Sequence, residues 1–242
     1  MSDASAGSAR RNLGLPRVPR LADVRSRVNV ADIAVRLFQA HGYEATSTIQ
    51  IAAAAGVSRS TFFRQFRSKD DVIFADHDEL LGQIDTYFAL QHGDPWLAVC
   101  EAAALVFERF RERLEIVRVR DLVVRQTSVL RDRETVMVSR YEKVFSAYLR
   151  RSLPDLEPVI AIQFAAAVIA THNFELRRMI RANDGAGLLD SAGLAAQLHA
   201  VRDRFTGGQT AAGASELLVA VFPASALPHD VARMIENRLR SV

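Results

Sequence analysis

The chain is poor in cysteine, with a single one, Cys100, among its 242 residues. No disulfide can therefore form within the chain, which suits a reducing compartment, so we predict a cytoplasmic protein. We expect Cys100 to be a small buried apolar residue rather than a redox sensor.

Long hydrophobic runs are also missing. The most apolar stretch, residues 159–170, is interrupted by Gln163 and is shorter than the roughly 20 residues that a membrane span needs. The arginines near the amino terminus are not followed by an apolar segment. We therefore predict neither a secretory signal nor a membrane partner.

Recognisable catalytic motifs do not occur. The chain has no G-x-S-x-G, no H-E-x-x-H, no paired cysteines with metal-ligand spacing and no phosphate loop. We therefore predict that the protein is not an enzyme, and that it has no catalytic residues, no metal and no cofactor. His77 and His92 are expected at the surface or its boundary.

Charge is distributed unevenly along the chain. Residues 1–70 hold eleven Lys or Arg and five Asp or Glu, a net charge of +6, whereas the whole chain carries +3. The remainder is therefore mildly acidic, at −3. A basic front on an acidic body is the pattern expected of a nucleic-acid-binding end joined to a separate body.

Two short helices joined by a tight turn can be read in residues 47–66. Ser47 and Gln50 have the spacing of a capping box, which begins the first helix. Gly56 tolerates the left-handed backbone that ends a helix, and Ser58 can cap the next one. This order predicts a helix-turn-helix motif.

The second of these helices has two different faces. Phe62 and Phe66 are four residues apart and share the inner face. The outer face carries hydroxyls, the guanidinium groups of Arg59 and Arg64, and the ring of Phe63. Such groups can contact guanine edges, phosphates, sugar and thymine methyl groups in the DNA major groove.

At these residues the chain resembles the TetR family of bacterial transcriptional regulators. The match is carried by Ile51, Ala52, Ala54, Ala55, Gly56, Val57, Ser58, Thr61, Phe62, Phe66, Ser68, Lys69 and Asp70. Phe63 departs from the family, which often has tyrosine there, and Gln65 stands where histidine or tyrosine is common. The departures remove a hydroxyl contact to phosphate and leave the expected fold unchanged.

We predict an all-α fold with a three-helix DNA-binding head and a larger helical body. The divisions are a disordered basic arm at 1–22, the helix-turn-helix domain at 23–69 with its motif at 47–66, the body at 70–206, and a linker and C-terminal extension at 207–242. The arm could follow DNA or act as a solubilising tail, since composition fits both interpretations.

The predicted DNA contacts lie at the start of each helix of the motif and along the second one. They are Thr46, Ser47, Arg59, Ser60, Thr61, Phe63, Arg64, Gln65 and Lys69. The resemblance implies a homodimeric repressor that binds double-stranded DNA at a palindromic operator and is released by a small-molecule effector.

The body is expected to begin with one helix from Lys69 to about Leu90, a lever between head and body. Residues 159–170 are apolar nearly all round and must be covered on more than one face. The resemblance implies dimerisation through the last two long helices, and a central core helix is the alternative.

The effector site is predicted from aromatic and polar residues of the body: Trp96, Phe107, Phe110, Arg125, Tyr141, Phe145, Phe164 and His172. Ordinary core packing is an equally good interpretation of the aromatic residues. A dense set of arginines (Arg118, Arg120, Arg125, Arg131 and Arg133) suggests an anionic ligand such as an acyl-thioester of coenzyme A, although solvated helix faces have the same composition.

Two further hypotheses belong to other classes. A protein that coats DNA independently of sequence would bind random duplexes equally well, whereas a regulator prefers its operator by roughly a thousandfold or more. A helical enzyme would need a nucleophile and base together in a pocket, and the sequence shows no such pair.

Overall fold

The computed structural model describes residues 21–90, 92–182 and 191–207. Within these ranges every regular element is a helix, which confirms the all-α prediction. In chain order the helices are α1 (Leu21–His41), α2 (Thr48–Ala54), α3 (Arg59–Gln65), α4 (Lys69–Ile73), α5 (Ala75–Phe88), α6 (Pro95–Glu112), α7 (Leu114–Gln126), α8 (Ser128–Ser152), α9 (Pro158–Arg181) and α10 (Ser191–Thr206). The predicted arm lies outside the described residues as far as residue 20, and so does the predicted extension from residue 208.

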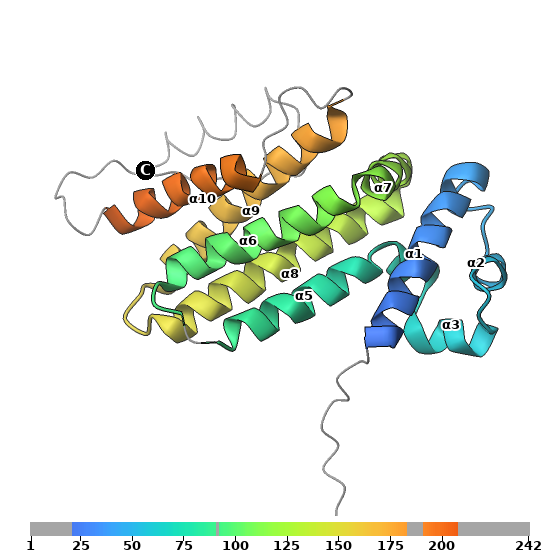
Figure 1. Ribbon diagram of the computed structural model, residues 1–242, viewed down its shortest axis with the longest axis horizontal. Helices are drawn as coiled ribbons and strands as arrows, with labels where there is room; N and C mark the ends of the chain where they lie inside the picture. Colours follow the sequence, from blue (N-terminus) through green and yellow to red (C-terminus); the bar gives the residue numbers. More distant parts are fainter. Residues whose placement is uncertain (1–20, 91, 183–190, 208–242) are drawn as a thin grey trace, which may run out of the picture.

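Helices α1, α2 and α3 form a small head at one end of the molecule (Figure 1). The capping box is present, because the Ser47 amide donates to Gln50 Oε1 at 2.7 Å and the Gln50 amide donates to Ser47 Oγ at 3.2 Å. Gly56 has φ +66°, the left-handed backbone that favours glycine, and Ser58 caps α3. The predicted helix-turn-helix is confirmed.

The apolar core of the head lies behind α3. Phe62 and Phe66, which the sequence predicts on the inner face, are buried there with Phe38 of α1 and Ile51 of α2, and Leu37 packs against the same cluster. The cluster continues beyond the head into residues 72–75 and into the facing parts of α7 and α8. Head and body therefore share one continuous stretch of apolar packing.

The prediction of a single helix from Lys69 to Leu90 is wrong, because the helix is interrupted at Phe74. This residue has φ −112° and ψ 16° and separates the five-residue helix α4 from α5. The Phe74 side chain is buried in the core of the head, whereas Leu80 and Ile84 further along α5 belong to the core of the body. Packing of Phe74 in one apolar cluster and of the following residues of α5 in another outweighs the helical continuity that the local sequence favours.

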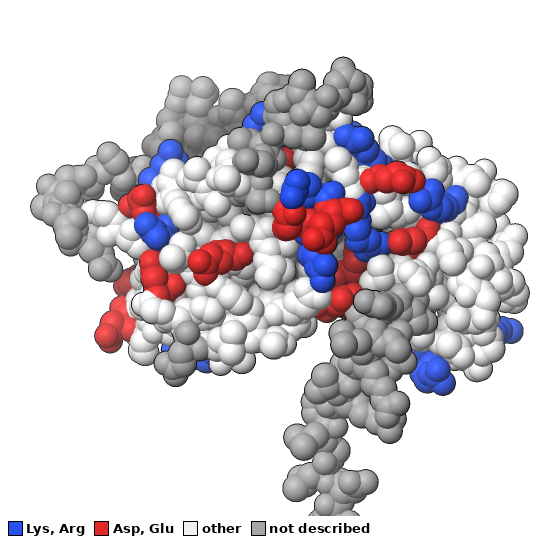
Figure 2. All heavy atoms as spheres, viewed as in Figure 1, with Lys and Arg blue, Asp and Glu red and all other residues white. Residues whose placement is uncertain are grey.

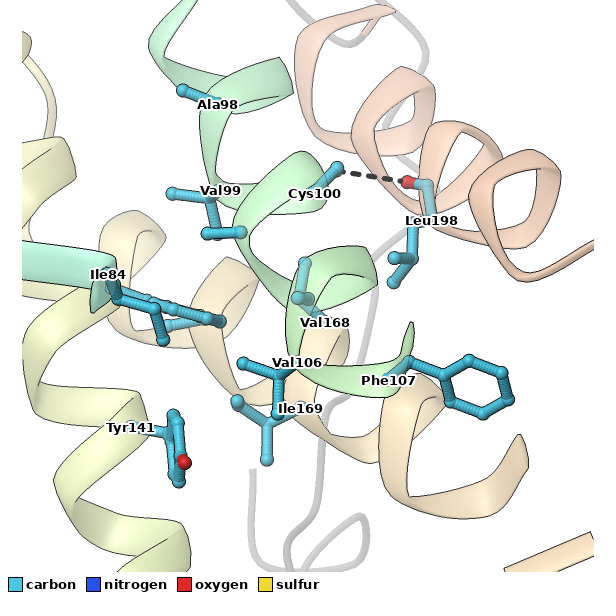
Figure 3. Close-up of a cluster of buried hydrophobic side chains, with 14 of the residues drawn as sticks. Ile84, Ala98, Val99, Cys100, Val106, Phe107, Tyr141, Val168, Ile169 and Leu198 are labelled. Carbon is cyan, nitrogen blue, oxygen red and sulfur yellow. Dashed lines mark hydrogen bonds between the residues drawn. The ribbon is translucent and has the colours of Figure 1, made fainter. Parts of the chain in front are cut away.

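The body is a bundle in which α5, α6, α8, α9 and α10 run side by side for much of their length (Figure 1). Its core packs aliphatic side chains of α6 and α9 between the flanking helices (Figure 3). Cys100 lies in this core, and its Sγ donates to the Leu198 carbonyl at 3.4 Å. Burial raises the pKa of the Cys100 thiol to about 12, which keeps the thiol protonated at neutral pH, and Cys100 is buried as predicted.

Helix α9 is long and apolar enough, by length and composition alone, to cross a membrane. The core helix of a helical bundle has the same properties, and α9 contacts α6, α8 and α10. Its exposed apolar residues, Val159, Ile162 and Phe174, form a stripe of the helix that the described residues do not cover.

Replacement of Phe62 by alanine should lower the free energy of unfolding by about 3–5 kcal/mol, because its side chain is 0% exposed and its loss leaves a cavity. The neighbouring Phe63 is 46% exposed, and its replacement by alanine should change stability by less than about 1 kcal/mol. Urea unfolding of both variants and the wild type measures the contrast. Equal losses for Phe62→Ala and Phe63→Ala would contradict the described orientation of α3.

Candidate nucleic-acid interface

The outer face of α3 presents groups that suit a nucleic acid. Arg59, Ser60, Phe63 and Arg64 are all exposed, while Phe62 on the opposite face is fully buried. The structure thus brings these four predicted contact residues together on one surface.

The hydroxyl groups at the start of α3 form hydrogen bonds within the first turn of the helix. Ser58 Oγ accepts the Thr61 amide at 3.1 Å, and it lies 2.9 Å from the hydroxyls of both Ser60 and Thr61. This small network fixes the first turn of α3, so that its exposed side chains are presented in one orientation. A hydroxyl can both donate and accept, so Ser60 and Thr61 retain capacity for an external partner.

Thr46 does not fit its predicted role as a contact residue. It is only 2% exposed, and its hydroxyl donates to the Gly42 carbonyl at 2.8 Å. That bond closes the turn between α1 and α2, so the Thr46 side chain is not on the surface. Ser47, the next residue, is exposed.

The ammonium group of Lys69 is partly occupied by contacts within the protein. It donates to the Tyr43 carbonyl at 2.7 Å and lies 3.9 Å from the centre of the Tyr43 ring. These contacts join the start of α4 to the turn after α1. Gln65 is also turned partly inward, because its Oε1 is buried.

Positive charge dominates the exposed charged residues of the motif. Arg59, Arg64 and Arg67 are exposed, and Glu44 is the sole acidic residue between residues 42 and 69. At the junction of head and body, in contrast, basic and acidic side chains are interleaved (Figure 2). The exposed arginines of the motif can therefore attract a polyanion, whereas the basic and acidic side chains of the junction pair with one another.

The centre of the junction is Asp76 at the start of α5. Its Oδ2 accepts from Arg120 of α7 at 2.6 Å and lies 3.6 Å from the guanidinium of Arg113, between α6 and α7. Arg113 also donates to Asp32 of α1. Burial by itself raises the pKa of Asp76, but the neighbouring charges, chiefly Arg120, outweigh burial and the pKa is lowered. The carboxylate therefore stays ionised and links the body to α1.

Further ion pairs surround this centre and also cross from one element to another. Asp78 of α5 accepts from Arg140 of α8 at 2.7 Å and from Arg27 of α1 at 3.4 Å. Arg133 of α8 pairs with Asp71 of α4. The orientation of the head is thus held by several charged contacts that a movement of α7 or α8 would disturb.

A second group of polar residues lies inside the body, around the buried ring of Phe110. The imidazoles of His77 and His172 lie 5.3 Å and 6.3 Å from the Phe110 ring centre, and His77 Nδ1 is 3.2 Å from the Tyr141 hydroxyl. His172 Nδ1 lies 3.2 Å from Asn173 Oδ1, and its Nε2 is buried with no hydrogen-bond partner among the residues that the structure describes. We call these four residues, Phe110, His77, Tyr141 and His172, the imidazole cluster.

Burial lowers the pKa of both His77 and His172 to about 4. Both rings are therefore neutral at physiological pH. His77, predicted at the surface or its boundary, is half-buried and was missed as a candidate residue, although its position three residues before Leu80 and seven before Ile84 places it on the inward side of α5.

The other predicted effector residues divide into those that adjoin this cluster and those that do not. Phe107 and Phe145 adjoin it, because the Phe107 ring centre lies 5.9 Å from that of His172 and the Phe145 ring centre lies 6.5 Å from that of Tyr141. Trp96 and Phe164 pack together with a ring separation of 4.8 Å, in a separate group with Phe205. Arg125 is exposed and pairs with Asp121, so it does not face the aromatic residues.

The arginines that suggested an anionic ligand all have acceptors within the chain. Arg118 donates to the Ile180, Met179 and Ala182 carbonyls at the end of α9, and Arg131 donates to the Arg125 carbonyl. The other three pair with carboxylates, namely Asp76, Asp121 and Asp71. An anion would have to displace these partners. Within the described ranges no group of three or more His, Cys, Asp or Glu residues could hold a metal ion.

The exposed face of α3 on a helix-turn-helix head, joined to a helical body, defines a DNA-binding transcriptional regulator. The family model of the bacterial regulatory proteins of the tetR family matches residues 31–75. The chain is also 31% identical, over 147 residues, to a Mycobacterium tuberculosis protein named as the mycofactocin biosynthesis transcriptional regulator MftR; the match covers 57% of this chain and 71% of that protein. The chain belongs to the TetR family.

Two further similarities agree with this assignment. The chain is 35% identical to the transcriptional regulator AcrR of Shigella flexneri over 88 residues, which are 34% of this chain and 40% of that protein. A solved TetR-family regulator from Syntrophomonas wolfei has the same fold, with a TM-score of 0.55 and 16% identity over 79% of this chain and 98% of that one. The family is one of transcriptional regulators rather than enzymes.

The buried imidazole of His172 and the half-buried imidazole of His77 predict acid sensitivity. Each has a pKa of about 4 in the folded protein and about 6.5 when unfolded, so between these pH values the unfolded state binds more protons. The free energy of unfolding should therefore fall as the pH is lowered from about 6.5 towards 4, by up to about 3 kcal/mol for His172.

Urea unfolding at a series of pH values checks this expectation. The His172→Phe variant should lose stability less steeply over the same range, because one titrating group is gone and the ring still fills its place. Carboxylates contribute equally to both proteins and cancel in the comparison. Parallel pH profiles for the two proteins would show that His172 is not buried in its neutral form.

Proposed function

We propose that the protein is a cytoplasmic homodimeric repressor that binds a palindromic operator in double-stranded DNA and is released by a small molecule. The exposed face of α3 carries this proposal. Its arginines and its ring stand outward on a helix fixed from behind by Phe62 and Phe66, which is the arrangement that a major groove accepts.

Dimerisation is supported by the uncovered stripe of α9. Val159, Ile162 and Phe174 are exposed on a helix whose other faces are buried in the body. A two-fold interface would cover this stripe on both copies at once. It would also present two α3 helices, which must lie roughly 34–36 Å apart to enter successive major grooves.

Selection of bound duplexes from a random pool tests the proposal. A palindromic sequence with two half-sites about one helical turn apart should be enriched. Enrichment of no sequence would support the alternative of sequence-independent coating and defeat the repressor proposal.

The selected operator then allows the predicted phosphate contacts to be measured. The slope of log affinity against log salt is negative. Arg64→Ala should make it shallower by about 0.9 for each phosphate that the arginine neutralises in the wild type. Arg150→Ala, which removes an exposed arginine of the body, should leave the slope unchanged. Lys69→Ala separates its two roles, because an unchanged slope would leave only its contact with Tyr43.

The imidazole cluster is the proposed point of effector recognition. Nδ1 of the neutral His172 ring faces the acceptor Asn173 Oδ1, which makes Nε2 a hydrogen-bond acceptor without a partner among the described residues. A buried acceptor of this kind is costly unless it is satisfied. An apolar effector with one hydroxyl or N–H donor would satisfy it.

A panel of apolar alcohols, amides and acyl-thioesters can test effector binding by thermal stabilisation and by release of operator DNA. Donor-bearing compounds should raise the melting temperature of the wild type, as binding to the folded state requires. The His172→Leu variant should keep operator affinity and lose this response, whereas His199→Ala, at an exposed position of α10, should keep both. A response retained in His172→Leu would place recognition elsewhere.

A further inference from the structure

Phe63 is an exposed aromatic residue on a face otherwise made of polar groups. Its side chain is 46% exposed, although the residue before it, Phe62, is completely buried and already fills the core of the head. Phe63 therefore contributes little to the core. A large apolar group kept in water on the surface that meets DNA is more consistent with a contact made on binding.

The ring of Phe63 is held in place from two sides. It meets the buried Phe62 ring edge to face, with centres 5.5 Å apart and an angle of 84°. The guanidinium of Arg59, one helical turn earlier, lies 5.7 Å from the Phe63 ring centre. These two contacts restrict the Phe63 ring, which lowers the side-chain entropy that it loses when it meets a partner.

The two side chains have complementary partners in the major groove. An arginine pairs with O6 and N7 of guanine, and an aromatic ring makes an apolar contact with the 5-methyl group of thymine. The separation of 5.7 Å between guanidinium and ring centre is less than two base-pair rises of roughly 3.4 Å each. Groups this close together address neighbouring positions of the same half-site.

We propose that Phe63 is a specificity-determining residue that reads the methyl group of one thymine in each half-site, at most two base pairs from a guanine read by Arg59. The inference rests on the proposed function, since it requires an operator. It goes further by naming which chemical group in that operator is recognised, and by which side chain.

The test uses the full-length protein and the operator selected from the random pool. Each thymine is replaced in turn by deoxyuridine, which removes only the methyl group. At one position of each half-site this change should weaken wild-type binding about fourfold, the effect of withdrawing one buried methyl group. Replacement of a guanine within two base pairs of that thymine by 7-deazaguanine should weaken operator binding by the wild type. The same replacement should leave the operator affinity of Arg59→Ala unchanged.

Variants at Phe63 distinguish a methyl contact from other roles. Phe63→Ala should bind the thymine operator more weakly and should show no further weakening with deoxyuridine. Phe63→Tyr keeps the ring and should keep the fourfold sensitivity. Circular dichroism and melting of both variants confirm that the head is folded, as expected for an exposed position.

Three results would overturn the inference in different ways. Wild-type protein that binds every deoxyuridine operator as tightly as the thymine operator places the ring against sugar or backbone instead. Sensitivity retained in Phe63→Ala assigns the methyl contact to another residue. Failure to select any operator removes the proposed function as well, and so is distinguishable from the other two.

Discussion

The ion pairs of Asp76 are the constraint on which the arrangement of head and body depends. This carboxylate stays charged inside the protein because Arg120 and Arg113 face it, and Arg113 is shared with Asp32 of α1. Taking such charges out of water costs nearly as much as their attraction returns, so the network adds little to net stability. Its geometry is nevertheless constrained, because separation from Arg120 would leave the buried Asp76 carboxylate with only the more distant guanidinium of Arg113. The network therefore fixes where the head sits rather than whether the chain folds.

Helix α7 connects this constraint with the rest of the body. Arg120 on α7 holds Asp76, whereas Arg118, two residues earlier, holds the last carbonyls of α9. Arg120 also lies over the ring of Phe110, at 5.1 Å from its centre, beside the imidazole cluster. A molecule that displaces Phe110 would therefore act directly on the residue that secures the head. A ligand can shift this arrangement only by as much as it prefers one position of α7 over another.

Sequence patterns predicted the head better than the body, and physical chemistry explains the difference. The turn of the motif depends on local groups, namely Ser47, Gly56 and Ser58, whose capping roles can be read within a few residues. The break at Phe74 depends on two cores that meet only in three dimensions, and no local signal announces it. Thr46 shows the same limit, because its hydroxyl is turned inward by the path of the α1–α2 turn. The eight predicted effector residues divided into separate groups for this reason too, since helical periodicity gives the buried face but not the neighbour across the bundle.

The shortness of α3 limits how much information one head can extract from DNA. Seven residues extend about 10 Å along a helix axis, which is the length of roughly three base pairs. Three positions distinguish roughly 64 sequences, yet even a small genome offers about a million competing sites. A single α3 helix would thus find a matching sequence every few dozen base pairs, and the protein would be distributed over all of these sites. A site that occurs once in a genome must therefore be recognised by more than one such helix. The length of α3 alone makes one recognition helix insufficient to select a single gene.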